Sequence, residues 1–335
     1  MVNILISNDD GVNAPGILAA KKSLEDLGNI TVVAPDDEHS GLGRSLTVMK
    51  PLKINKTTLN DGSVAFGVSG TPSDSVSLGI HEIMEIKPDI VIAGINLGRN
   101  ICKSEITKSG TIGASLEAVN SGIPSLAVSL SIDHRDVKFE DNQLKFIKEP
   151  DFSFASKILH KVVKKILIKG LPKNVDLLNL NIPSYPSSDK IMITSLADKM
   201  FDTEIINKRN ENNEDYYLLS PKMVKNYDKG TDGYALLNKK CVSLSPLRFD
   251  MTGSINSLKK WWKIFKEDND MDINEWEIWY KNILNDFGFS REGDEKTADV
   301  LNDILDKKGC FDIDDLYDYV TKKTLSKNFI VFLVT

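Results

Sequence analysis

The sequence predicts an α/β protein: a mostly parallel sheet flanked by helices, with a β-hairpin-rich extension and a C-terminal, mostly helical appendage. Two observations carry this prediction. Short apolar, β-prone runs, typical of buried parallel strands, alternate with segments of helical periodicity. Several of these runs end in polar clusters, as strands do where an α/β sheet builds its binding sites. The composition agrees, since 41% of the residues are hydrophobic and 27% are charged, an ordinary globular balance.

The first part of the chain is predicted to form a strand, a helix and a second strand. An apolar run at residues 4–6 has the character of a buried parallel strand. Residues 14–27 carry an apolar stripe at helical spacing, and Gly28 provides a suitable stop. Residues 30–35 are the second apolar, β-branched run. A strand, a helix and a strand in this order imply a parallel sheet.

The elements that follow are predicted from the same signals. Residues 46–68 alternate apolar and polar positions around an Asp61-Gly62 turn signal, which predicts a short β-meander or hairpin. Thr71 or Ser73 is expected to cap the next helix. Further strands are predicted at residues 88–95, 125–130, 177–183 and 241–245, and further helices begin near Ser109 and span residues 152–168.

The C-terminal part of the chain differs in character from the rest. Residues 190–245 are predicted to be β-rich and irregular, whereas residues 295–325 look largely helical. The run at residues 329–334 is short, apolar and β-prone, which is typical of a strand. We therefore predict a first domain over residues 1–250 and a C-terminal extension over residues 251–335. The extension is expected to shape assembly rather than chemistry.

Charge and cysteine content exclude several classes of function. A net charge of −6 argues against a protein that binds a nucleic-acid polymer mainly through electrostatics. Cys102, Cys241 and Cys310 are far apart, form no CxxC pair and are odd in number, which favours a reducing compartment. The sequence shows no signal-peptide pattern and no apolar run of membrane-spanning length. We expect a cytoplasmic protein with neither a membrane nor a nucleic-acid polymer as partner.

Asp9 and Asp10 follow the first predicted strand directly, and Gly11 comes next. In an open α/β sheet, ligands bind just beyond the carboxyl ends of the strands. Adjacent carboxylates repel each other unless a cation neutralises them or one takes a proton. Mg²⁺ and Mn²⁺ prefer such oxygen ligands. On its own, however, the pair fits a solvated Asp-Asp-Gly turn equally well.

Three further polar clusters come at corresponding places. The loop after the second strand, which contains Ser40 and Gly41, can point N–H groups and hydroxyls at a phosphate or a metal, or can be an ordinary connection. Asn96 and Asn100 end the third clear strand. Residues 109–111, Ser-Gly-Thr, open a helix and can bind an anion or provide a plain N-cap. Together these groups form an all-oxygen set that suits Mg²⁺ or Mn²⁺ and leaves room for water and a phosphate.

At these positions the sequence closely resembles the SurE family, the survival protein E phosphatases. The resemblance covers roughly residues 1–250, and several separate motifs fall in the family's order. The matching stretches are Ile4 to Gly11, Ala14 to Ile17, Val33 to Pro35 through Ser40-Gly41, Ser69 to Asp74, Gly94 to Asn96 with Gly98 and Asn100, Ser109 to Thr111, Thr231-Asp232 and Val242 to Leu247.

The resemblance implies a fold, a site and an activity. It assigns one divalent metal ion per subunit, Mg²⁺ or Mn²⁺, to Asp9, Asp10, Ser40 and Asn96, and it matches Asn8, Gly41, Asn100, Ser109, Gly110 and Thr111 to the phosphate-binding surroundings. It implies a metal-dependent 5′-nucleotidase that acts on nucleoside 5′- and 3′-monophosphates. It further implies a Rossmann-like core and a homodimer or homotetramer built partly by swapped C-terminal elements.

Attack by a metal-activated water is the expected mechanism, with Asp9 or Asp10 aligning or deprotonating that water. A phosphatase that forms an aspartyl-phosphate is one alternative. That class places its second Asp two positions after the first, whereas Asp9 and Asp10 are adjacent. A nucleotide-binding regulatory protein without turnover is the other alternative, and phosphate release from a nucleotide panel separates it from an enzyme.

Overall fold

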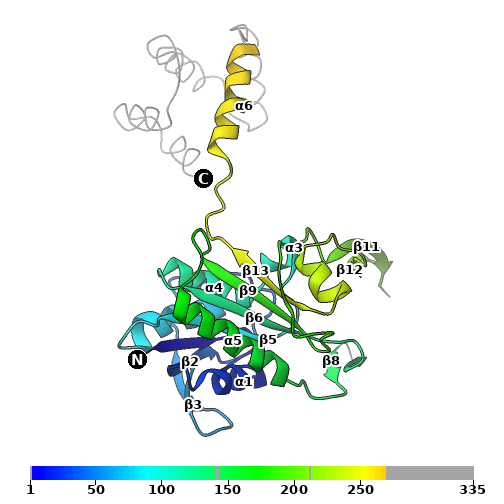
Figure 1. The fold of residues 1–335 in the computed structure, drawn as a ribbon. Helices are drawn as coiled ribbons and strands as arrows, with labels where there is room; N and C mark the ends of the chain where they lie inside the picture. Colours follow the sequence, from blue (N-terminus) through cyan, green and yellow to red (C-terminus); the bar gives the residue numbers. More distant parts are fainter. Residues whose placement is uncertain (1, 141–142, 211–212, 269–335) are drawn as a thin grey trace, which may run out of the picture. The chain divides into compact units, whose positions relative to one another are not determined.

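The computed structural model describes residues 2–140, 143–210 and 213–268. The chain divides into two compact units, Met1–Met251 and Thr252–Thr335 (Figure 1). In the second unit, the described residues form helix α6 (Ile255–Asp268) and the short segment before it. The helices predicted within residues 295–325 and the strand predicted at residues 329–334 lie outside the described residues. The domain assignment made from the sequence stays a prediction.

A nine-stranded sheet forms the centre of the first unit, in the order β10-β13-β9-β6-β5-β1-β2-β4-β3. Neighbouring strands are parallel except for the β3–β4 and β13–β9 pairs, so the predicted, mostly parallel sheet is confirmed. The strands are β1 (Asn3–Ser7), β2 (Asn29–Pro35), β3 (Ile54–Thr58), β4 (Val64–Val68), β5 (Ile90–Leu97), β6 (Ser125–Ser131), β9 (Leu177–Pro183), β10 (Ile191–Ile193) and β13 (Val242–Leu247).

Helices cover both faces of the sheet, because side chains of each buried strand alternate between two apolar layers. In β1, Ile4 and Ile6 belong to one buried cluster and Leu5 to the other. Helices α1 (Pro15–Leu24) and α5 (Ser153–Lys169) pack on the Ile4 face, and Figure 1 shows them side by side. On the Leu5 face lie α2 (Pro72–Leu78), the π-helical η1 (Gly79–Ile83) and α4 (Gly110–Asn120).

The remaining elements sit around the rim of the sheet. Helix α3 (Cys102–Ile106) follows β5, and the π-helical η2 (Tyr234–Asn238) precedes β13. Two hairpins pair only within themselves in the described residues: β7 (Val137–Glu140) with β8 (Gln143–Phe146), and β11 (Phe201–Arg209) with β12 (Asp215–Met223). Among the described residues, no helix is both long and apolar enough to cross a membrane.

The sheet changes its direction of growth at β1, and this change positions the site. The chain leaves β1 for β2 on one side and later returns to lay β5 on the other side. At such a switch point the connections diverge and leave a crevice beyond the carboxyl ends of the strands. Asp9 and Asp10 follow β1, and Asn96 lies near the end of β5, so all three belong to this crevice.

Candidate active site

The two carboxylates after β1 are each held by a hydrogen bond from a different element. Asp9 is only 4% exposed, and its Oδ1 accepts a hydrogen bond from the Thr111 hydroxyl in α4 at 2.6 Å. Asp10 is half-buried, and its Oδ2 accepts from the Leu97 main-chain N–H in β5 at 3.1 Å. The solvated turn that the sequence left open is therefore excluded for Asp9, because its side chain is buried between β1 and α4.

Burial makes the ionised form of both carboxyl groups unfavourable. It raises the pKa of Asp9, while hydrogen bonds from the Thr111 side chain and main chain work in the opposite direction. Burial, followed by the neighbouring charge of Asp9, raises the pKa of Asp10 to about 7. A cation bound between the two carboxylates would offset the repulsion between their negative charges.

The start of α4 approaches Asp9 closely because residue 110 is a glycine. A Cβ on Gly110 would lie 2.8 Å from Asp9 Cβ and 2.9 Å from Asp9 Oδ2. Ser109 is the N-cap, and its side-chain oxygen accepts a hydrogen bond from the Ile112 N–H at 3.1 Å. Ser109 is thus a helix cap, and its hydroxyl proton remains available to an anion.

A bulge in β5 directs Asn96 toward the site. The register between β5 and β6 shifts between Ala93 and Asn96, where Gly94 has a φ of +137° and a Cβ would lie 2.3 Å from the Val128 carbonyl oxygen. The Asn96 side-chain NH₂ donates to the Ser129 hydroxyl at 3.3 Å. This contact leaves the side-chain oxygen of Asn96 as an acceptor for a cation.

One hydrogen-bond network joins Asn100 to Asp9. The Asn100 side-chain NH₂ donates to the Thr111 hydroxyl at 3.1 Å and to the Ser129 hydroxyl at 2.9 Å. Thr111 in turn donates to Asp9. The structure therefore brings Asp9, Asp10, Asn96, Asn100, Ser109, Gly110 and Thr111 together at one end of the sheet.

Three residues to which the sequence analysis assigned no role support this network: Asn179, Asn181 and Asp232, the last from the Thr231-Asp232 stretch that resembles the family. The side-chain NH₂ groups of Asn179 and Asn181 donate to the Asn100 carbonyl at 2.7 and 3.0 Å, and Asn181 Oδ1 accepts from the Asn100 N–H at 3.0 Å. Asp232, fully buried, accepts from the Cys102 N–H at 2.8 Å. Asparagines two residues apart in an apolar strand were the available signal, because such residues share one face.

The loop after β2 carries Ser40 and Gly41 and lies against the same crevice. The His39 N–H donates to the Asp9 carbonyl oxygen at 2.8 Å, which ties the loop to the end of β1. Both Ser40 and Gly41 are exposed, and the Ser40 hydroxyl donates to Glu38 Oε1 at 2.7 Å. The loop is thus placed next to the carboxylates, while the Ser40 hydroxyl is bonded to Glu38 and not to either carboxylate.

The donor set fits a hard divalent cation. Nowhere in residues 2–140, 143–210 and 213–268 do three His, Cys, Asp or Glu side chains converge on a common point. A metal here would therefore be held by two carboxylates and neutral oxygens, as Mg²⁺ and Mn²⁺ prefer. Asn8 adds a further oxygen, since its Nδ2 donates to the Gly11 carbonyl at 3.0 Å while its buried Oδ1 has no partner in the described chain.

Comparisons with known proteins agree with one another. A family model described as "Survival protein SurE" matches residues 4–203. The "5'-nucleotidase SurE" of Methanobrevibacter smithii is 47% identical over 260 residues, which is 77% of this chain and 99% of that protein. The protein of the same name from Methanothermobacter thermautotrophicus is 49% identical over 216 residues, 64% of this chain and 81% of that protein. The crystal structure of the SurE protein from Aquifex aeolicus superposes with a TM-score of 0.65 at 32% identity, over 77% of this chain and 99% of that one.

Proposed function

The chain belongs to the SurE family, and from this premise we propose that it is a metal-dependent phosphohydrolase of nucleoside 5′- and 3′-monophosphates. Relatives that it matches over most of their length are named 5'-nucleotidases. The observation that carries the proposal is the Asp9-Asp10 pair at the switch point, in which Asp9 is buried and bonded to Thr111 in the first turn of α4 while Asp10 is bonded to Leu97 in β5. That arrangement combines two anionic oxygens for a cation with a helix N-terminus for an anion.

We assign one Mg²⁺ or Mn²⁺ ion per subunit to Asp9, Asp10, Ser40 and Asn96. When bound, such an ion supplies positive charge to a phosphate oxygen and lowers the pKa of a water. The Asn96 side chain is already oriented by Ser129. Ser40 completes the set once its hydroxyl exchanges Glu38 for the metal, and its exposed loop permits that rotation.

The residues around the carboxylates divide the work of binding and proton transfer. Asp9 or Asp10 is the carboxylate that we assign to align the attacking water or to accept its proton. Ser109, Gly110 and Thr111 present a hydroxyl and the positive end of α4 to the phosphoryl oxygens. The phosphate surroundings that we assign further include Asn8, Gly41 and Asn100.

A homodimer or homotetramer is part of the proposal. The β11–β12 hairpin leaves large apolar side chains in solvent, with Ile205 66%, Tyr217 65% and Leu219 72% exposed. A second copy of the chain that covers the hairpin would remove these side chains from water. Light scattering measures the mass of the assembly.

The cytoplasmic location also stays a prediction, and the free thiols of the buried Cys102 and Cys241 support it.

Phosphate release from a panel of nucleoside monophosphates tests the proposed activity. We expect turnover with Mn²⁺, loss of turnover with a chelator, and at least a hundredfold loss in Asp9→Asn and Asp10→Asn with the fold retained. Near-normal turnover by both variants at saturating metal would sink the assignment. Nucleotide binding without any phosphate release would support the regulatory protein instead, and trapping of phosphate on Asp9 would support an aspartyl-phosphate enzyme.

A further inference from the structure

A second hollow lies beside the carboxylate pair, at the carboxyl ends of β5, β6 and β9. Its volume is about 150 Å³. The side chains that matter for its chemistry come from these strand ends and from the segment around β7 and β8: Leu97, Ser131, Asp136, Phe146, Ser184 and Tyr185. None of these residues belongs to the proposed metal or phosphate site.

The cavity and the carboxylate pair share a wall. Leu97 lines the cavity, and its main-chain N–H is the group that donates to Asp10. Arg99, between Asn96 and Asn100 in sequence, donates through Nε to the Ser131 hydroxyl and through a terminal nitrogen to the Ile132 carbonyl, both at 2.8 Å. Ser131 and Ile132 also line the cavity. The cavity therefore shares Leu97 with the Asp10 contact, and it shares Ser131 and Ile132 with the Arg99 contacts.

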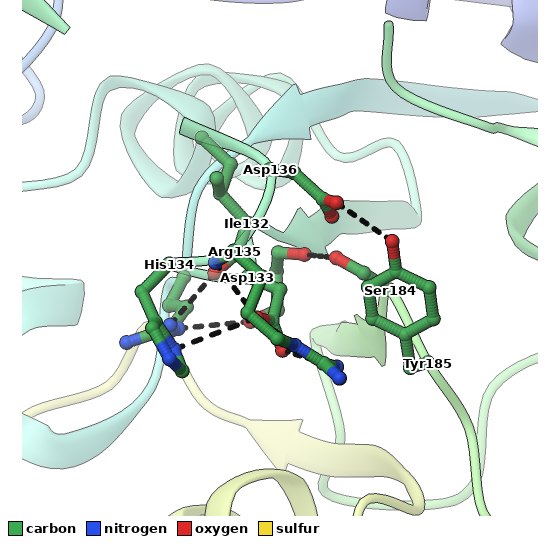
Figure 2. A network of polar contacts seen from close by, with 9 residues as sticks. Ile132, Asp133, His134, Arg135, Asp136, Ser184 and Tyr185 are labelled. Atoms are coloured by element: carbon green, nitrogen blue, oxygen red, sulfur yellow. Dashed lines mark hydrogen bonds and ion pairs between the residues drawn. The ribbon is translucent and has the colours of Figure 1, made fainter. Parts of the chain in front are cut away.

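Tyr185 gives the cavity a fixed aromatic wall. Its hydroxyl donates to Asp136 Oδ1 at 2.7 Å, and the Arg135 guanidinium carbon lies 4.6 Å from the ring centroid (Figure 2). The neighbouring Ser184 hydroxyl donates to the main-chain oxygen of Ser131, which ties the chain after β9 to the end of β6. Tyr185 as a whole residue is 39% exposed and thus offers surface to a ligand, while Lys148 Nζ lies 5.4 Å from the ring centroid.

The polar groups in the cavity select the chemistry of that ligand. Three carboxylates, Asp136, Glu149 and Asp151, line the cavity together with Lys148. Arg99 and Arg135 contact its wall at Ser131 and Tyr185. A planar group that carries N–H or O–H donors is favoured, since carboxylates only accept hydrogen bonds. Tyr185 and Phe146 supply the apolar and aromatic area that such a group needs. A base and its ribose meet both requirements.

We propose that this cavity receives the nucleoside part of the substrate, with Tyr185 and Phe146 against the base and Asp136 accepting hydrogen bonds from base or ribose. The assignment rests on the proposed function, since it concerns the non-phosphate part of the same substrate. It makes Tyr185 a specificity residue that acts on nucleotides and not on phosphate esters in general.

Truncation of the aromatic wall tests this inference. Tyr185→Ala should raise KM for adenosine 5′-monophosphate roughly tenfold, which is the scale of a lost base–aromatic contact. It should leave kcat/KM for p-nitrophenyl phosphate within about twofold, because that ester places no base in the cavity. Tyr185→Phe keeps the ring and should stay close to the wild type. Ile147→Ala is the matched control, since Ile147 is 63% exposed and does not line the cavity.

A binding assay separates the failure of this inference from the failure of the proposed function. Adenosine, which has no phosphate, should inhibit hydrolysis of p-nitrophenyl phosphate by the wild type and by Ile147→Ala, but not by Tyr185→Ala or Phe146→Ala. Equal inhibition of all four proteins, or equal losses on both substrates in Tyr185→Ala, overturns the inference. If the wild type hydrolyses neither substrate, the proposed function fails, and calorimetric titration with adenosine decides the cavity assignment on the same four proteins.

Discussion

The Thr111 hydroxyl lies 2.6 Å from Asp9 Oδ1 and donates a hydrogen bond to it, although 102 residues separate the two in sequence. This contact joins the end of the first strand to the first turn of α4. The same hydroxyl accepts a hydrogen bond from the Asn100 side chain at 3.1 Å. Thr111 therefore couples the anionic side of the crevice to the loop after β5.

Removal of this hydroxyl should weaken metal binding. The Thr111 hydrogen bond lowers the pKa of Asp9 against the effect of burial, so Thr111→Val should shift the carboxyl group toward its protonated form. A lost hydrogen bond to a buried charge corresponds to about 1–3 kcal/mol, so we expect Mn²⁺ to bind roughly tenfold or more weakly. Calorimetric titration with Mn²⁺ measures the change. Thr58→Val, at an exposed position of β3, is the control, and an equal effect of both variants contradicts the role of Thr111.

A side chain at position 110 should displace the Asp9 carboxylate. Gly110→Ala places a Cβ within 3.0 Å of both Asp9 Cβ and Asp9 Oδ2, closer than real Cβ contacts allow. We expect kcat/KM to fall at least tenfold and inhibition by inorganic phosphate to weaken. Gly253→Ala is the matched control, because its Cβ would meet nothing within 4 Å. Unchanged phosphate inhibition in Gly110→Ala counts against the α4 cradle.

The stability of the metal-free protein should fall as the pH rises. Burial and then the charge of Asp9 raise the pKa of Asp10 from 3.8 to about 7, so between these values the folded chain holds a proton that the unfolded chain has lost. The free energy of unfolding is therefore highest below pH 3.8, the pKa of Asp10 in the unfolded chain. It declines as the pH rises to about 7, the pKa of Asp10 in the folded protein. With chelator present, we expect a lower Tm at about pH 8 than at about pH 5.

Added Mn²⁺ should reverse this trend, because the cation replaces the proton and stabilises the folded state more at the higher pH. Scanning calorimetry with and without Mn²⁺ follows both effects. In Asp10→Asn, both the decline and the metal response should shrink. A metal-induced rise in Tm that is independent of pH would show that no proton is displaced at this pair.

Loss of the Asp232 carboxylate should destabilise the loop behind the site. The carboxylate accepts hydrogen bonds from the main-chain N–H groups of Cys102, Ala197 and Gly233 at 2.8, 2.8 and 2.7 Å. Asp232→Ala leaves all three buried donors unpaired, so we expect a loss of about 3 kcal/mol in the free energy of unfolding by urea. Asp228→Ala, at an exposed position in the same segment, should change it by less than about 0.5 kcal/mol.

The strands of the central sheet were predictable because buried parallel strands leave an unmistakable apolar run. The strand predicted at residues 177–183 matches β9, and the predicted hairpin matches β3 and β4 around Asp61-Gly62. The strand predicted at residues 88–95 runs on to Leu97, because β5 continues past a bulge to pair again with β6. A bulge breaks the alternation of side chains, so the pattern ended early.

Other features depend on tertiary contacts that no local pattern encodes. The β7–β8 hairpin was not predicted, since its strands pair only with each other and need no buried apolar face. The polar strand ends pointed to Asp9 and Asn96 because strand ends converge in an α/β sheet, and the Ser-Gly-Thr stretch that opens a helix pointed to Thr111. The supports at Asn179 and Asn181 became visible only when β9 was seen beside β6.

The residues that hold the loop at Asn100 and Cys102 come late in the sequence, so the parts of the site are synthesised in a fixed order. A ribosome makes the proposed metal ligands, Asp9 to Asn96, early, whereas Asn179, Asn181 and Asp232 follow much later. Because chains fold from the N-terminal end during synthesis, a nascent chain that stops before Asp232 holds every ligand without the groups that fix the loop between them. We therefore expect competence for catalysis only late in translation, once β13 has entered the sheet between β9 and β10.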